Sequence, residues 1–282
     1  MKNTISFQGE LGSYSHQACL DLYPDHEVLP CATFESAIDS VTKGHSQLTM
    51  LPIENSTYGR VADIHSLLPL SGLTIIKEYF LRVIIHLLAL PGSNIGKIKS
   101  AVSHTVLLGQ CQNFLKANKI TGVAGPDTAG SAKKVALQKN SSIAALASDL
   151  AGEIYGLQSL ASDIEDMQNN TTRFLIMAED NNLIDKKLNK KVCMTTLVFE
   201  VRNLPAALYK ALGGFATNGI NMLKLESYMI GGSFTATQFY LDIEGHPDSL
   251  PVERALEELK YFTSSVSILG VYEKHPYRPK GR

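Results

Sequence analysis

The feature that most constrains the fold is a regular alternation of short apolar runs with amphipathic helical patterns, from residue 1 to about residue 177. Short apolar runs bounded by turn residues are typical of buried strands. Strands that alternate with helices form a parallel or mixed sheet with helices on its faces. We therefore predict an α/β fold here, with strands at residues 4–7, 27–29, 48–53, 98–103, 120–123 and 142–146.

Three amphipathic helices are expected between these strands. The first has Thr33 as its N-cap, carries apolar side chains at helical spacing and ends at Gly44. The second covers residues 106–118, and the third begins after Asp127 and Thr128.

The chain is expected to form two lobes in this region. The apolar segment 73–90 lacks helix punctuation and is expected to carry the chain from a first α/β unit into a second, with a return crossing near residues 156–162. Ligands of such folds bind at the carboxyl ends of strands, in the crevice between units.

A second domain is predicted after a polar linker at residues 181–192. It has the order strand, helix, strand, strand, helix, strand, which is the ferredoxin-like βαββαβ arrangement. The expected elements are residues 194–201, 205–217, 221–230, 234–243, 251–262 and 265–272, with the middle hairpin turning at Gly231 and Gly232.

Composition excludes several classes of protein. The formal net charge is −1, with 26 basic and 27 acidic residues. The chain therefore lacks the excess of positive charge that is typical of proteins that bind nucleic acid. The basic tail with Arg278, Lys280 and Arg282 is interpreted as a solvated terminus. The sequence shows neither an N-terminal export segment nor an apolar stretch of the ~20 residues that a membrane helix needs, so a cytoplasmic location is expected.

Motifs for metals, nucleotides and acyl-enzymes are missing from the sequence. The four cysteines lie far apart without a C-x-x-C pair, and the histidines show no ligand spacing. We therefore expect no cofactor and no metal, and reduced thiols.

Polar clusters stand where strands end or begin. Glu54, Asn55 and Ser56 terminate an apolar strand, and an ordinary solvated loop remains an equal interpretation. Ser103 and Thr105 precede a helix, where either could simply be a cap; an exposed helix N-terminus would also suit an anion.

Three further positions extend this pattern. Gln110 lies further along the helix predicted over 106–118, and Ser13 and Thr128 lie at the starts of two other predicted helices. Thr172 and Arg173 lie at the start of a predicted strand. Instead of a functional role, Thr172 could reflect strand propensity, and Arg173 could be a surface or interface ion-pair partner.

Together these clusters resemble the prephenate dehydratase family. Residues 7–15 resemble its opening G-x-x-G-(S/T)-(F/Y)-S segment, 52–56 its P-I-E-N-S, 103–111 its S-H-P-Q-A-L-A-Q-C, and 170–174 its N-x-T-R-F. Thr105 and Val106 stand where the family often has Pro-Gln, so a role for that glutamine does not apply here.

The resemblance implies a fold and an activity. It implies a two-lobed, periplasmic-binding-protein-like catalytic domain over residues 1–180, which converts prephenate into phenylpyruvate without a cofactor. It implies Thr172 as the catalytic hydroxyl and Glu54 beside the substrate, where burial of its carboxyl would make it the other candidate proton donor. The remaining implied site residues are Asn55, Ser103 and Gln110 around the substrate, and Ser13, Ser56, Thr128, Arg173 and Phe174 in binding.

Residues 193–275 resemble an ACT regulatory domain. The motifs P-G-A-L and I-E-S-R-P align with altered segments of this chain at 205–208 and 225–229. The resemblance implies that phenylalanine is the regulatory ligand and that the protein is a homodimer or homotetramer. The implied ligand residues are Asn203, Ala206, Ala207, Leu208, Glu226 and Ser227.

Two alternatives remain open at the level of sequence. One is a family member that acts on arogenate, the aminated analogue of prephenate. The other is a non-catalytic sensor of an amino acid or anion, built from the same two lobes and ligand-sensing domain.

Overall fold

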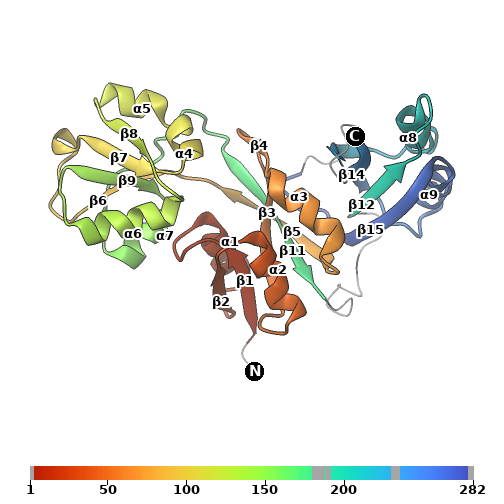
Figure 1. Cartoon of the computed structure of the whole chain (residues 1–282), viewed down its shortest axis with the longest axis horizontal. Helices are drawn as coiled ribbons and strands as arrows, with labels where there is room; N and C mark the ends of the chain where they lie inside the picture. Colours follow the sequence, from red (N-terminus) through yellow and green to blue (C-terminus); the bar gives the residue numbers. More distant parts are fainter. Residues whose placement is uncertain (1–2, 180–187, 189–191, 230–235, 279–282) are drawn as a thin grey trace. The chain divides into compact units, whose positions relative to one another are not determined.

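The computed structural model of the chain describes residues 3–179, 188, 192–229 and 236–278. It divides into two compact units (Figure 1). The first combines Met1–Val61 with Tyr79–Phe174, and the second combines Ala62–Glu78 with Leu175–Arg282. Two strands, β5 (Thr74–Arg82) and β11 (Thr171–Ala178), pass from one unit into the other.

The first lobe of the first unit is built on a parallel arrangement of three strands. Strand β1 (Thr4–Gln8) pairs in parallel with β2 (Glu27–Cys31) on one side and β3 (Leu48–Asn55) on the other. Strand β11 is the next neighbour of β3 in the sheet order, and the short β4 (Gly59–Arg60) pairs antiparallel with the end of β3. The strands predicted at 4–7, 27–29 and 48–53 are confirmed.

Helices α1 (Tyr14–Leu22) and α2 (Phe34–Thr42) pack on these strands. The predicted N-cap of α2 is confirmed, because the Thr33 hydroxyl accepts the backbone N–H of Ser36 at 3.1 Å. Apolar side chains of β1 and β3, among them Ile5, Phe7 and Met50, are fully buried beneath the helices.

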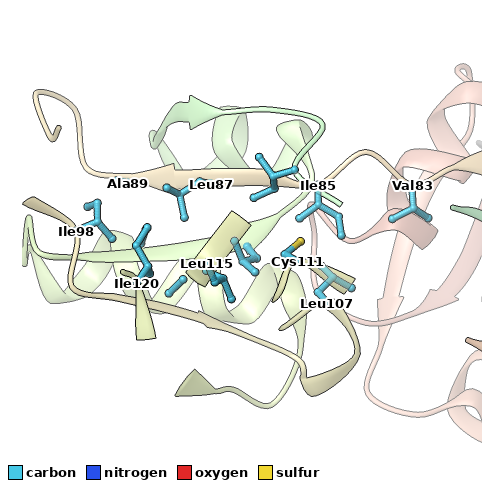
Figure 2. Close-up of a cluster of buried hydrophobic side chains, with 13 residues drawn as sticks. Val83, Ile85, Leu87, Ala89, Ile98, Leu107, Cys111, Leu115 and Ile120 are labelled. Atoms are coloured by element: carbon cyan, nitrogen blue, oxygen red, sulfur yellow. The ribbon is translucent and has the colours of Figure 1, made fainter. Parts of the chain in front are cut away.

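The second lobe contains a five-stranded sheet in the order β10-β6-β9-β7-β8. Its strands are β6 (His86–Ala89), β7 (Ser100–Ser103), β8 (Thr121–Ala124), β9 (Ile143–Ala147) and β10 (Gln158–Ala161). Its helices are α4 (Thr105–Gln110), α5 (Gln112–Ala117), α6 (Thr128–Gln138) and α7 (Asp149–Tyr155). Figure 2 shows the core that holds α4 and α5 on this sheet: Leu107 and Leu115 face Ile85, Leu87 and Ile120.

The helix predicted over 106–118 is wrong as one element, because it breaks at Cys111 into α4 and α5. The backbone N–H of Asp166 donates to the Gln110 carbonyl at 2.6 Å, and the Asp166 carboxylate accepts from Asn113 N at 3.1 Å. A neighbouring segment thus takes the groups that a continuous helix would use, and it caps the new helix start.

Two crossing segments join the lobes and lie side by side. Val83 N donates to the Asn170 carbonyl at 2.8 Å, and Ile164 N to the Ile85 carbonyl at 3.3 Å. The buried Glu165 carboxylate accepts Ile85 N at 3.0 Å. The sequence predicts the return near 156–162, but residues 158–161 form β10 of the second sheet, and the chain returns through residues 162–170.

The second unit has the predicted βαββαβ order, which is confirmed. Its elements are β12 (Cys193–Val201), α8 (Ala207–Thr217), β13 (Met222–Met229), β14 (Ala236–Glu244), α9 (Leu250–Phe262) and β15 (Thr263–Glu273). Strands β12, β13, β14 and β15 pair antiparallel, and α8 and α9 pack together over a shared apolar core. The hairpin turn at Gly231 and Gly232, and the predicted linker apart from Leu188 and Val192, lie outside the described residues.

The start of the second unit packs on this sheet. Helix α3 (Ala62–Leu67) and a 3-10 turn (Leu68–Leu70) precede β5, which pairs with β15 where Ile75 faces Gly270. Glycine is required there, because a Cβ on residue 270 would lie 2.2 Å from the Ile75 carbonyl oxygen.

The expectation that Arg278 is a solvated terminal residue is wrong. Its Nε and Nη2 donate to the two carboxylate oxygens of Glu78 at 2.7 and 2.9 Å, and Glu78 is buried. A buried carboxylate requires hydrogen-bond donors, and Arg278 supplies two of them to Glu78. This ion pair fixes Arg278 within the second unit.

No helix in the part of the chain that the structure describes is long and apolar enough to cross a membrane.

Candidate active site

The candidate site lies in the first unit, where the end of β3 meets the start of β11. The Ser56 hydroxyl holds the two together: it donates to the Asn169 carbonyl at 2.6 Å and accepts Thr171 N at 2.9 Å. Ser56 N also donates to the Thr171 carbonyl at 2.8 Å. The hydroxyl of Ser56 is thereby committed to the backbone, and it brings two sequence motifs 115 residues apart into contact.

Glu54 and Arg173 form an ion pair across the two strands. Arg173 Nη1 donates to Glu54 Oε1 at 2.9 Å, and only 1% of the Arg173 side chain is exposed, against 31% for Glu54. A buried guanidinium at hydrogen-bond distance stabilises the charged form of its carboxylate partner. The arrangement therefore presents Glu54 as a hydrogen-bond acceptor.

Asn55 contacts the Thr172 hydroxyl, and the direction of this hydrogen bond is fixed by the backbone. Asn55 Oδ1 accepts the backbone N–H groups of Thr57 and Tyr58, both at 3.0 Å. Because a backbone N–H can only donate, the oxygen of the amide must face these two residues and the nitrogen must face the other way. Asn55 Nδ2 then donates to Thr172 Oγ1 at 3.1 Å.

Thr172 consequently accepts a hydrogen bond, and no side-chain acceptor for its own O–H lies among the described residues. A hydroxyl has one hydrogen and two acceptor positions. Thr172 is partly exposed on β11, which leaves it within reach of a ligand. The site thus presents a donor hydroxyl whose oxygen is polarised by an amide.

Gln110 reaches this cluster from the end of α4. Its Nε2 donates to Thr57 Oγ1 at 2.6 Å, and its Oε1 accepts from Asn170 Nδ2 at 3.1 Å. These three residues line a cavity of about 240 Å³ together with Gly109, Glu165, Asp166 and Met167. Asn55, Gln110 and Thr172, each singled out by sequence, are therefore joined through Asn170 in one hydrogen-bonded cluster. Glu54, the neighbour of Asn55 on β3, pairs with Arg173, and adjacent side chains of a strand point to opposite faces.

Other residues singled out by sequence are placed elsewhere in the first unit. Ser103 is fully buried on β7 and donates to the Leu146 carbonyl at 2.7 Å, and Phe174 is buried in the core. Ser13 is the N-cap of α1, where it accepts His16 N at 3.2 Å, and Thr128 is the first residue of α6. Within the described residues, none of these four has a hydrogen bond to the cluster around Asn55.

The cap of α4 differs from the expected one, and α6 has an aspartate cap. His104 caps α4 through its ring nitrogen, which accepts Val106 N at 3.3 Å, in place of Ser103 or Thr105. Ser103 is held by β9 instead, which explains why it is not the cap. Asp127 caps α6 by accepting Gly130 N.

Thr57 and Asn170 are members of the cluster that residue-by-residue reasoning did not select. Asn170 is the first residue of the N-x-T-R-F segment and is 1% exposed, so its position in that motif was a usable signal. Thr57 follows the P-I-E-N-S segment directly, and only the fold reveals that its side chain turns back to Asn55 at 2.8 Å.

Cys111, interpreted from sequence as a core residue, is fully buried. Burial, and then the charges of Asp166 and Glu165, raise the pKa of the thiol. The sulfur therefore stays protonated at neutral pH and is no nucleophile. Among the residues that the structure describes, no group of three His, Cys, Asp or Glu side chains is arranged to hold a metal ion.

Comparison with known proteins finds a family and relatives whose names share the term prephenate dehydratase. The profile of the prephenate dehydratase family matches residues 5–182. A bifunctional N-acyl-homoserine lactone acylase/prephenate dehydratase of Komagataeibacter europaeus is 45% identical over 276 residues, which is 98% of each chain. An arogenate dehydratase/prephenate dehydratase of Arabidopsis thaliana is 34% identical over 95% of this chain and 72% of its own.

A solved structure agrees with the fold. Prephenate dehydratase of Arthrobacter aurescens in complex with L-Phe superposes with a TM-score of 0.87 at 27% identity, covering 99% of this chain and 92% of that one. The agreement extends over both units of the chain.

Proposed function

This chain belongs to the prephenate dehydratase family, and from that premise we propose that the cluster around Thr172 removes carbon dioxide and water from prephenate to give phenylpyruvate. The chain is thus an enzyme, a carbon–oxygen lyase. The observation that carries the assignment of Thr172 is the fixed Asn55 amide, which donates to Thr172 Oγ1 and leaves its hydrogen for the substrate.

The reaction requires few functional groups from the protein. Prephenate carries a ring carboxylate, a pyruvyl side chain and a ring hydroxyl, and loss of the carboxylate with the hydroxyl makes the ring aromatic. Aromatisation supplies the driving force, so an electron sink is not needed. The protein has to orient the ring, assist departure of the hydroxyl and exclude water.

Thr172 assists the departing hydroxyl as a positioned hydrogen-bond donor. A free threonine is a very weak acid, so its contribution is to stabilise by hydrogen bonding the charge that develops on the leaving oxygen, which takes up a proton from the solvent as water departs. The hydrogen bond from Asn55 to Oγ1 supports this role, because it polarises the hydroxyl and occupies one of its acceptor positions.

Glu54 is the competing candidate for the proton donor, and its ion pair favours Thr172. A carboxylate held at 2.9 Å by the buried Arg173 guanidinium is stabilised in its charged, proton-free form. In this proposal Glu54 and Arg173 fix the β3 and β11 ends on which Asn55 and Thr172 stand. Ser103, Ser13 and Thr128 support the surrounding strand and helix ends.

The proposed reaction is tested by assaying purified protein against three substrates. We expect phenylpyruvate from prephenate without added metal or nucleotide, followed by absorbance. Arogenate is the second substrate, since a relative named for both activities is 34% identical. An N-acyl-homoserine lactone is the third, because identity of 45% along two full chains makes acylase activity a second candidate function. If the protein turns over the lactone and does not turn over prephenate, the proposed dehydratase activity is contradicted.

Replacing Thr172 tests its role in the chemistry. Thr172→Ala should lower kcat by roughly 10²-fold or more, because the leaving hydroxyl loses its donor. Thr172→Ser keeps the hydroxyl and should be much milder. Equal and small losses in the two variants would remove Thr172 from the mechanism.

The second unit is proposed to be an ACT domain that binds phenylalanine and regulates a cytoplasmic homodimer or homotetramer. The candidate ligand residues lie at the start of α8 (Asn203, Ala206, Ala207, Leu208) and on β13 (Glu226, Ser227). Ala206 has φ of +60°, a left-handed backbone that favours glycine, and the resembled motif has glycine there. Strand β13 stands at the end of the sheet order, so its outer edge is the surface proposed for pairing between copies.

Phenylalanine binding is measured by calorimetry on the full chain, with the oligomer size followed by light scattering. We expect binding at or below millimolar phenylalanine. Ser227→Ala should weaken it, while Ser264→Ala, an exposed serine on β15, should not. The absence of a heat of binding at millimolar phenylalanine would contradict the regulatory proposal, and it would not bear on the proposed dehydratase activity.

A further inference from the structure

Four side chains at the site form a closed ring of hydrogen bonds in which each donates to the next. Asn55 Nδ2 donates to Asn170 Oδ1 at 2.8 Å, and Asn170 Nδ2 donates to Gln110 Oε1 at 3.1 Å. Gln110 Nε2 donates to Thr57 Oγ1 at 2.6 Å, and the Thr57 hydroxyl donates to Asn55 Oδ1 at 2.8 Å. Every member therefore both gives and receives one bond within the ring.

The direction of the ring follows from its anchor in the backbone. The N–H groups of Thr57 and Tyr58 hold Asn55 Oδ1, so Asn55 must donate from the opposite side of its amide. Asn170 then presents its oxygen to Asn55 and its nitrogen to Gln110, and Gln110 presents its own nitrogen to Thr57. The single Thr57 hydrogen closes the ring on Asn55, its alternative acceptor being Asn170 Oδ1 at 3.4 Å.

We propose that Thr57 is a positioning residue of the reaction, which holds the Asn55 amide so that its second N–H points at Thr172. This inference rests on the proposed function of Thr172. Asn55 Nδ2 has two hydrogens, one for Asn170 and one for Thr172, so a rotation of the amide would withdraw both. Thr57 resists that rotation through two contacts with Oδ1, one from its backbone and one from its hydroxyl.

The ring also makes the geometry at Thr172 depend on the second lobe. Gln110 stands on α4, whereas Asn55 ends β3, Thr57 follows it in the next turn and Asn170 precedes β11. Thr57 is the member through which Gln110 and Asn55 are joined on one side of the ring. Hydrogen bonds in such a closed chain polarise one another, so the loss of one weakens its neighbours.

The experiment replaces the hydroxyl of Thr57 by a methyl group of the same shape. Thr57→Val should lower kcat for prephenate roughly tenfold, the cost of about one hydrogen bond, with KM changed by less than about twofold. Thr57→Ser retains the hydroxyl and should recover most of the lost kcat. The matched control is Thr121→Val, an exposed threonine on β8, which should leave kcat unchanged.

A second comparison separates positioning from general support of the fold. In a Thr172→Ala background, Thr57→Val should cost less than about twofold more, because the group that it positions is gone. Thermal unfolding of each variant confirms that it is folded, and Thr57→Ala takes the place of Thr57→Val if the latter does not fold.

Three results would overturn the inference: wild-type kcat in Thr57→Val, equal losses in the valine and serine variants, or the same tenfold loss with and without Thr172. The proposed function fails separately, by absence of prephenate turnover in the wild-type protein.

Discussion

Two backbone N–H groups decide how the side-chain amide of Asn55 is oriented in the candidate site. The amides of Thr57 and Tyr58 can only donate, so they hold the oxygen of the Asn55 side chain and turn its nitrogen toward Thr172. An asparagine that could rotate would leave the Thr172 hydroxyl free to donate to Asn55 itself. The turn that follows β3 thus determines which partner receives the hydrogen of a threonine 117 residues away in the sequence.

The fold serves to bring that turn and that threonine together. Ser56 joins the end of β3 to the start of β11 through the backbone, and the Glu54–Arg173 ion pair fixes the same strands from their side chains. The segments that cross between the lobes run beside this junction, and one of them ends at Asn170. The second unit is held by different means, including the close contact of Gly270 with Ile75 and the burial of Glu78 against Arg278.

Much of the fold could be predicted because its signals are local. Apolar runs and turn residues predict β1, β2, β3 and the βαββαβ order, since each depends on a short window of sequence. The break of the helix at Cys111 could not be predicted, because Asp166, 55 positions later, supplies the competing hydrogen bonds. The burial of Arg278 likewise depends on Glu78, which is 200 residues away.

The same distinction applies to the site. Glu54, Asn55, Gln110 and Thr172 stand in motifs at strand and helix ends, so sequence could nominate them, and the fold joins the last three through Asn170. Ser103 has an equally suggestive sequence context, yet its hydroxyl is taken by the backbone of β9. Thr57 has no distinguishing context, and its role depends on where a turn directs its side chain.

The most direct test of the account is Asn55→Asp, which keeps the shape of the side chain and removes its N–H donors. A carboxylate would accept the Thr172 hydrogen, so we predict a loss of kcat of roughly 10²-fold with prephenate. Asn169→Asp, which places the same charge on an exposed neighbour, should change kcat by less than about threefold. An Asn55→Asp enzyme that turns over prephenate at the wild-type rate would contradict the claim that Asn55 donates to Thr172.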